Sequence, residues 1–307
     1  MNNTPEFQEG LSIAAVERDT GLLKDTLRVW ERRYGFPQPL RDANGERLYP
    51  PAQIARLRQI KRLMDQGMRP GKIFAADEAT LAAWLGKDAP STEPPPHCRS
   101  MIDLLQQQRS EALRQSLQQN LLKLGLQRFV TEIVVPLNIE VGLAWLRGDI
   151  TVGEEHLYSE LLQNMLRNAV HALRNPAGRP RILLTTLPDE LHSLGLLMAE
   201  AMLVPEGAVC TSLGTQTPLG DIASTAMSGE FDIVALSFSA NYPARQAWNN
   251  LAELRRQLPA HITLWAGGRH LCERAPALDG LHYLKEIADA VSALESWRTQ
   301  HQTDQSS

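Results

Sequence analysis

The spacing of apolar residues changes once along the 307-residue chain. Up to about residue 175, apolar positions recur every three or four residues, which is the period of amphipathic helices. From about residue 180, short apolar runs such as "RILLTTL" and "DIVALSFS" alternate with helical stretches. This alternation predicts a parallel sheet covered on both faces. A fifth short strand at 281–284 would complete a flavodoxin-like sheet.

Two proline-rich breaks divide the pattern. The stretch "GKDAPSTEPPPH" holds three consecutive prolines, which exclude helix and strand and predict an extended linker. The stretch "RNPAGRP" ends the second helical block. The predicted organisation is a helical unit at 1–85, a linker at 86–97, a four-helix bundle at 98–178, a Rossmann-like α/β domain at 179–299 and a disordered tail at 300–307.

The first unit has the capping and turn residues typical of short helices followed by a hairpin. One helix begins after Ser12, a plausible N-cap, and stops at Gly21, and a second stops at Gly35. Asn44-Gly45 is a strong signal for a β-hairpin. Two helices joined by a short turn and followed by a hairpin predict a winged helix-turn-helix.

Charge is unevenly distributed, although the net charge is only −4. Residues 1–75 hold 13 Lys and Arg against 9 Asp and Glu, so this part carries +4 and the remainder −8. Only the N-terminal unit is therefore expected to meet a polyanion. The beginning of the chain shows no export signal, no apolar run approaches a membrane span, and three cysteines without CxxC spacing fit reduced thiols. We expect a cytoplasmic protein that does not bind membranes.

The second predicted helix and the hairpin carry the candidate DNA contacts. Arginine reads guanine edges or phosphates, and aromatic residues pack on the sugar-phosphate chain. A solvated, charged helix is the alternative interpretation. The candidates are Thr26, Arg28, Trp30, Arg32, Arg33, Arg47 and Tyr49.

The stretch from about residue 10 to residue 75 resembles the winged helix-turn-helix of MerR-type regulators. The matching features are Thr-Leu-Arg in the second helix, the aromatic-Glu-Arg that follows, Arg-x-Tyr in the wing and a helix rich in Ile, Leu and Arg. This resemblance implies that a dimer binds near-palindromic, double-stranded promoter DNA. No long coiled-coil helix follows residue 85, so oligomerisation is expected to come from the later domains.

In the α/β domain, the loop after the first strand contains a candidate metal ligand. Parallel sheets bind ligands at the carboxyl ends of their strands, and His192 lies there, two residues after Glu190. Alone, this histidine would be read as a surface residue. A carboxylate behind it, however, would orient the imidazole toward a metal. No GxGxxG motif supports a dinucleotide site.

The pattern E-x-H-x-x-G, S-x-S and G-G in this domain resembles the cobalamin-binding fold of methionine synthase and the mutases. The resemblance implies that His192 is the lower axial ligand of cobalt and that the nucleotide tail of the cofactor lies beside glycine and serine residues. Glu190 stands where the family has Asp. The candidate cofactor-binding residues here are Glu190, His192, Gly195, Leu213, Thr217, Ser237, Ser239, Gly267 and Gly268.

In the helical block, Trp145 is followed by nine residues and then by Glu155-His156. Alone, the tryptophan would be a core residue and the Glu-His pair a helix-start charge pairing. Together with the sheet, the spacing resembles the Trp-x9-Glu-His signature of light-sensing CarH/LitR-type repressors. It implies that Trp145 packs on the adenosyl group of adenosylcobalamin, while Glu155 and His156 form hydrogen bonds around it. Leu146 stands where that family places a second cobalt-binding histidine.

These resemblances together predict an adenosylcobalamin-dependent, light-responsive transcriptional repressor, not an enzyme. A homo-oligomer, dimer or tetramer, would bind promoter DNA in the dark and release it after light. One alternative is a MerR-type regulator whose sheet responds to another ligand or partner without photochemistry; the retained Trp145, Glu155, His156 and His192 argue against it. A second is a component of a cobalamin enzyme, which the absence of a substrate barrel disfavours.

Overall fold

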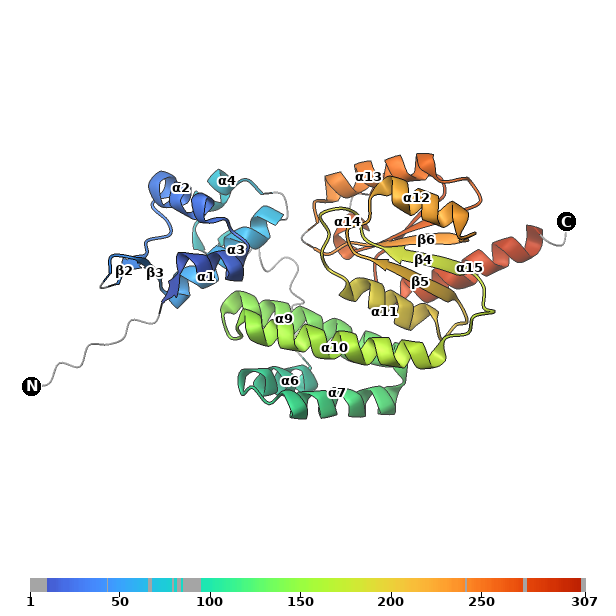
Figure 1. Cartoon of the computed structure of the whole chain (residues 1–307), viewed down its shortest axis with the longest axis horizontal. Coiled ribbons are helices and arrows are strands. Elements are labelled where there is room, and N and C mark those ends of the chain that lie inside the picture. The colour runs from blue at the N-terminus through green and yellow to red at the C-terminus, as the bar shows by residue number, and fades with distance from the viewer. Residues whose placement is uncertain are drawn as a thin grey trace, which may run out of the picture. The chain divides into compact units, whose positions relative to one another are not determined.

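A computed structural model describes residues 10–42, 44–65, 68–78, 80, 81, 84, 95–240, 242–272 and 275–304 (Figure 1). Most of the predicted linker lies outside these residues. The chain divides into two compact units. The first comprises Met1–Gln106 and Ile139–Glu155, and the second comprises Gln107–Asn138 and His156–Ser307. The helices of the predicted bundle are therefore shared between the two units.

The N-terminal part of the first unit is a winged helix-turn-helix, as the sequence predicts. Its elements are β1 (Leu11–Ser12), α1 (Ile13–Thr20), α2 (Lys24–Tyr34), β2 (Leu40–Arg41), β3 (Arg47–Tyr49), α3 (Pro51–Asp65) and α4 (Pro70–Phe74). The Ser12 hydroxyl caps α1 by accepting a hydrogen bond from the Ala15 amide at 3.3 Å. Gly21 and Gly35 end α1 and α2 in the left-handed conformation. The strands form an antiparallel sheet in the order β1-β3-β2, and β2 and β3 make the hairpin.

Five helical segments follow the N-terminal domain. They are α6 (Pro96–Gln106), α7 (Ser110–Leu124), α8 (Leu126–Phe129), α9 (Val135–Arg147) and α10 (Val152–Leu173), with a π-helix, η1 (Val130–Val134), between α8 and α9. Helix α6 begins two residues inside the predicted linker, because a proline is well tolerated at the first position of a helix. The linker prediction was therefore wrong at its last two residues.

The run Leu126–Arg147 corrects another expectation. Its 22 residues have a mean hydropathy of 1.5, so within the described part of the chain one helix is long and apolar enough to cross a membrane. The side chains of Phe129, Val130 and Val134 are fully buried inside the protein. Core helices of soluble proteins share this length and composition, so the run is weak evidence for a membrane span.

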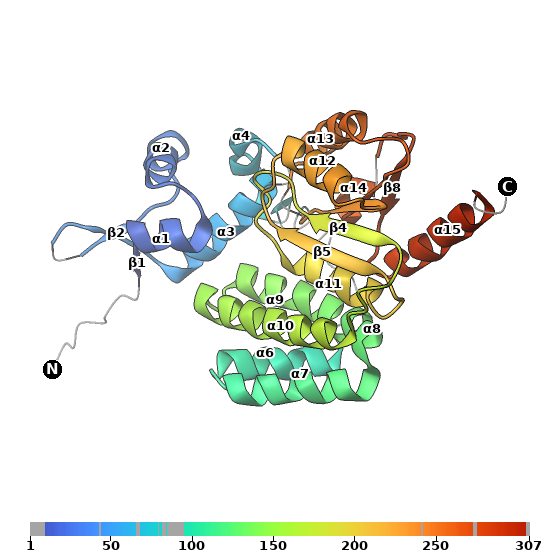
Figure 2. The same ribbon diagram turned by 45° about the vertical axis from the view of Figure 1, so that its right-hand side comes forward.

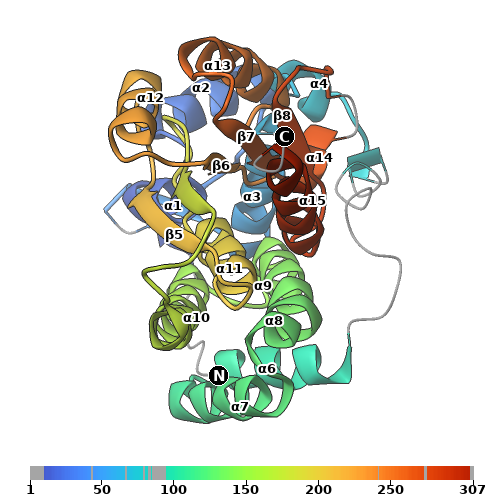
Figure 3. The same ribbon diagram turned by 90° about the vertical axis from the view of Figure 1, so that its right-hand side faces the viewer.

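The α/β domain is a flavodoxin-like, doubly wound sheet, which confirms the predicted fold class. Its strands are β4 (Arg181–Thr185), β5 (Val209–Gly214), β6 (Ile233–Ser237), β7 (Thr263–Gly267) and β8 (Leu281–Leu284), all parallel, in the order β5-β4-β6-β7-β8. Helices α11 (Leu194–Leu203) and α15 (Asp289–Asp304) cover one face (Figure 2). Helices α12 (Leu219–Ser228) and α13 (Ala244–Gln257) cover the other (Figure 3), and the short α14 (Arg269–Cys272) precedes β8.

The apolar strands explain why both faces are covered. Ile182, Leu183, Leu184, Val234 and Leu264 are at most 1% exposed, as expected for strands with helices on both sides. The carboxyl ends of all five strands meet at one edge, where the candidate ligand loops begin. Helix α15 runs to Asp304, so five residues of the predicted disordered tail are helical.

Candidate functional site

The loops after β4 and β5 are tied together by two threonines at the end of β4. Thr185 is fully buried, and its hydroxyl shares a hydrogen bond with that of Thr217 at 2.7 Å. The Thr186 hydroxyl donates to the Glu190 carbonyl at 2.7 Å and accepts from the Gln216 amide at 2.9 Å. These bonds fix the start of both loops at the edge of the sheet. Sequence reasoning missed Thr185 and Thr186, although two polar residues ending a buried strand were a usable signal.

Glu190 is the centre of the site in the loop after β4. Its side chain is only 2% exposed. One carboxylate oxygen accepts from the His192 amide at 3.0 Å and contacts Nδ1 of the His192 ring at 2.6 Å. The other accepts from the amide and hydroxyl of Ser239, both at 2.8 Å. His192 and Ser239, which were predicted from two separate motifs, are thus brought together around the buried carboxylate of Glu190.

The Glu190 contacts set the state of the His192 ring. Burial raises the pKa of Glu190, but hydrogen bonds from His192 and Ser239 to the ionised form outweigh it and leave this pKa below its ordinary value. An ionised carboxylate can only accept, so Nδ1 carries the proton and a neutral ring has its lone pair on Nε2. The His192 side chain is 58% exposed. This tautomer is the one that metal-binding histidines adopt with a carboxylate behind them.

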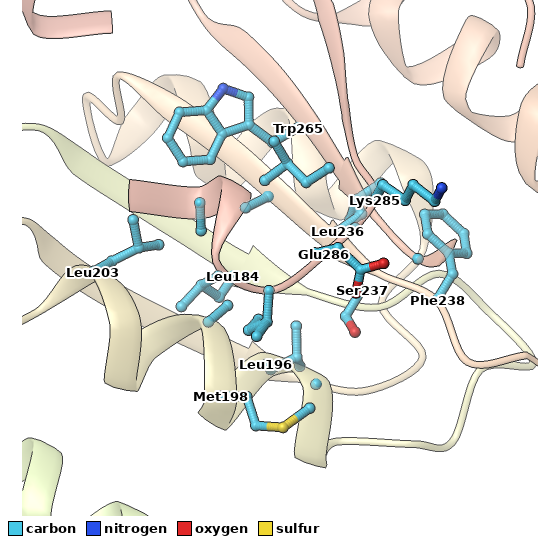
Figure 4. A pocket seen from close by; sticks show the side chains of 18 residues that line it. Leu184, Leu196, Met198, Leu203, Leu236, Ser237, Phe238, Trp265, Lys285 and Glu286 are labelled. Carbon is cyan, nitrogen blue, oxygen red and sulfur yellow. The ribbon is translucent and has the colours of Figure 1, made fainter. Parts of the chain in front are cut away.

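A cavity of about 190 Å³ lies beside this loop, between α11 and the ends of the strands (Figure 4). Gly195, Ser237, Gly267 and Gly268 all line it, together with apolar residues that include Trp265. A Cβ atom at Gly195 would lie 2.1 Å from the Ser237 hydroxyl oxygen, so the approach of α11 to β6 requires glycine there. The four predicted small residues therefore shape a single cavity.

Leu213 and Thr217 lie elsewhere at the same edge. Leu213 is 37% exposed at the end of β5, and Thr217 contacts Thr185. Neither lines the cavity. Their contact with a cofactor remains a prediction.

Trp145, Glu155 and His156 lie at the turn between α9 and α10. Trp145 is in the last turn of α9 and half-buried, Glu155 is in the first turn of α10, and His156 is exposed. Leu146 is 6% exposed and packs inside the protein. Trp145 and Glu155 belong to the first unit and His192 to the second. That the Trp-Glu-His motif faces His192 across a ligand therefore remains a prediction.

The candidate DNA contacts divide into exposed and buried residues. Arg28, Arg32 and Arg33 are exposed and Thr26 is half-buried on α2, so their contact with DNA remains a prediction. Arg47 in the wing is half-buried and pairs with Glu31 at 3.0 Å.

Two of the predicted DNA contacts belong to the core. Trp30 is 4% exposed and packs edge-on against Phe74, with ring centroids 5.1 Å apart. Tyr49 is fully buried. The expectation that these rings pack on the sugar-phosphate chain is corrected, because both fill the interior between α2, α3 and the wing.

The cysteines are free thiols. Burial raises the pKa of Cys98 to about 11 and that of Cys210 further. Neither thiol forms appreciable thiolate at neutral pH, which disfavours redox sensing.

Comparison with known families agrees with this domain order. A model described as MerR HTH family regulatory protein matches residues 11–76, and one described as B12 binding domain matches residues 98–169. Together with the α/β fold, these matches define a MerR-type transcriptional regulator with a B12-binding domain.

Two curated relatives specify the family. The chain is 32% identical over 268 residues to the HTH-type transcriptional repressor CarH of Myxococcus xanthus, covering 83% of this chain and 89% of that protein. It is 30% identical over 235 residues to the repressor CarA of the same organism, covering 74% and 76%. The chain therefore belongs to the family of the CarH and CarA transcriptional repressors.

A solved structure has the same fold. The monomethylamine corrinoid protein of Methanosarcina barkeri aligns with a TM-score of 0.51, covering 64% of this chain and 96% of that chain. The identity is 15%, so this likeness concerns the fold alone.

Proposed function

We propose that this protein is a light-responsive repressor that holds adenosylcobalamin on His192. The observation that carries the proposal is the Glu190 network, which fixes Nδ1 of His192 as the protonated nitrogen through a contact of 2.6 Å. An imidazole nitrogen is a suitable ligand for cobalt. The adjacent cavity of about 190 Å³, lined by Gly195, Ser237, Gly267 and Gly268, would receive part of the nucleotide tail of a corrinoid. An orientable imidazole beside a cavity lined by small residues is compatible with the cofactor and supports the proposal.

The upper face of the cofactor is assigned to the Trp-Glu-His motif. Trp145 would pack on the adenosyl group, and Glu155 and His156 would form hydrogen bonds around it. The spacing in the sequence and the family membership support this assignment. Leu146 has no metal-binding atom and is buried, so the light-adapted cobalt would take water or His156 as its upper ligand.

The proposed regulation is a shift between two populations. The cofactor would supply a cobalt–carbon bond that light cleaves. For regulation, the dark cofactor must favour the DNA-binding oligomer, a dimer or tetramer, and light must remove that preference. Arg28, Arg32 and Arg33 on α2 would then meet the DNA. We place this function in the cytoplasm and assign no catalytic activity.

Absorbance spectroscopy tests the proposal on the full chain. Adenosylcobalamin added in the dark should bind with a spectrum of histidine ligation, and illumination should change that spectrum irreversibly. His192→Ala should abolish the histidine-ligated spectrum. An unchanged spectrum in this variant would refute the axial-ligand assignment, and absence of binding to the wild type would favour a regulator that responds to another ligand.

Two further measurements address light and the upper ligand. Gel filtration in the dark and after illumination, with and without cofactor, should show a larger species only in the loaded dark sample. A bis-imidazole spectrum in illuminated His156→Ala protein would contradict both upper ligands that we propose.

A further inference from the structure

Arg58 on α3 reaches out of the DNA-binding domain to the end of helix α9. Its side chain is 9% exposed, and Nε and Nη2 donate to the two carboxylate oxygens of Asp19, each at 2.9 Å. The remaining terminal nitrogen, Nη1, donates to the main-chain carbonyl of Trp145 at 2.9 Å. Asp19 on α1 thus aims one guanidinium at a residue 87 positions further along the chain.

The same guanidinium lies over the Trp145 ring. Its Cζ is 5.2 Å from the ring centroid, within the range of a cation–π interaction. The carbonyl that it binds is in the last turn of α9, where the helix dipole attracts positive charge. Three attractions therefore hold Arg58 on one residue, and the planar fork of arginine suits all three at once.

We infer that Arg58 and the cofactor compete for Trp145, so that Arg58 is a latch between the DNA-binding domain and the sensing motif. This inference rests on the proposed function, in which Trp145 packs on the adenosyl group. Trp145 is half-buried, and Arg58 lies over its ring. In the inferred competition, the ligand packs on the face of the indole that Arg58 covers and displaces the guanidinium from it. Without cofactor the latch is closed; with cofactor it opens and releases α3.

Competition has a measurable consequence because coupling between two partners is reciprocal. If the cofactor must displace Arg58, a weaker latch makes the cofactor bind more tightly. Arg58→Lys retains a positive charge for Asp19 but loses the planar stacking and the forked donors. We expect it to bind adenosylcobalamin in the dark about 5-fold more tightly than the wild type.

Arg56→Lys is the matched control. Arg56 is on the same helix, and its Cζ lies 5.3 Å from the Phe36 ring centroid, so it makes a similar contact with a different ring. The affinity of the Arg56→Lys variant for the cofactor should equal that of the wild type. The gain in affinity from Arg58→Lys should also disappear in a Trp145→Leu background. Arg58 can keep its hydrogen bond to the main-chain carbonyl there, but no indole is left for which it and the cofactor compete.

The cofactor-free protein provides an independent readout. In thermal unfolding, the double variant Arg58→Lys/Trp145→Leu should lose less stability than the sum of the two single variants, because both substitutions remove the same contact. If Arg58→Lys does not fold, the double substitution Arg58→Met with Asp19→Asn replaces it, because it removes the cation from the ring without leaving an unpaired buried charge.

The outcomes separate the latch from the proposed function. A wild type that binds adenosylcobalamin, with unchanged or weaker binding in Arg58→Lys, overturns the competition and leaves the proposed function intact. The competition is also overturned if Arg58→Lys still raises the affinity for the cofactor in the Trp145→Leu background. Additive losses of stability in the cofactor-free protein overturn it as well. A wild type that does not bind the cofactor overturns the proposed function, and the competition with it.

Discussion

Asp19 in the DNA-binding domain and Glu190 in the α/β domain are nearly buried carboxylates that each hold one nitrogen-bearing side chain. Asp19, 10% exposed, binds the guanidinium of Arg58, and Glu190, 2% exposed, binds the imidazole of His192. A guanidinium is always charged in a protein, whereas an imidazole can be neutral. Asp19 therefore neutralises the permanent charge of Arg58, and Glu190 fixes the tautomer and the orientation of the His192 ring. The same arrangement compensates a buried charge in one region and, in the function that we propose, orients a metal ligand in the other.

The largest expected effect is on stability, where removal of each carboxylate should give a different loss of unfolding free energy. Asp19→Ala leaves a guanidinium that is 9% exposed without its carboxylate, which should cost about 3–5 kcal/mol of unfolding free energy. Glu190→Ala leaves a ring that can stay neutral and should cost about 1–2 kcal/mol. Calorimetry of the cofactor-free full chain measures both. Equal losses of unfolding free energy would contradict the comparison, because Glu190 would then compensate a buried charge as Asp19 does.

The two regions also differ in how far the sequence predicts them. Glu190 and His192 are two residues apart, so a local motif reveals the pair, and the apolar runs predicted the sheet that carries it. Arg58 lies 39 positions from Asp19 and 87 from Trp145, and no local pattern records such distances. Their pairing depends on how α1, α3 and α9 pack.

Burial explains the errors at Trp30 and Tyr49. Their place in a DNA-binding motif suggested DNA contact, but each is a large ring on an element with one face toward the core. Trp30 is 4% exposed and Tyr49 is fully buried. Tertiary packing decides which face of a short helix or hairpin is inward, and charge and motif spacing do not contain that information.

The second expected effect concerns cofactor binding. Glu190→Gln keeps the size of the side chain but removes the charge that orients His192, so affinity for adenosylcobalamin in the dark should fall about 10- to 100-fold. Glu200→Gln is the matched control, because Glu200 is 5% exposed in the same domain and pairs with Arg174 at 2.6 Å. Its affinity should stay within about 2-fold of the wild type. Equal losses in the two variants would attribute the effect to domain stability.

The smallest effect is a pH dependence that should belong to Glu190. Its pKa is lowered in the folded protein, because hydrogen bonds from His192 and Ser239 outweigh the opposing effect of burial. A carboxyl group with a lowered folded pKa stabilises the fold at pH values above its unfolded pKa, about 4.3. That contribution is lost as the pH falls through the folded pKa, where the carboxyl group is protonated in both states.

The stability difference between wild type and Glu190→Gln should therefore be present at about pH 5 and shrink below about pH 4. Urea unfolding of cofactor-free protein across this range measures it. Glu200→Gln controls for acid effects unrelated to the His192 loop. A difference that stays constant down to pH 3 would mean that Glu190 acts through its shape and neutral hydrogen bonds. In that case the negative charge of Glu190 would not be what orients His192, and the contrast between Glu190 and Asp19 would not hold.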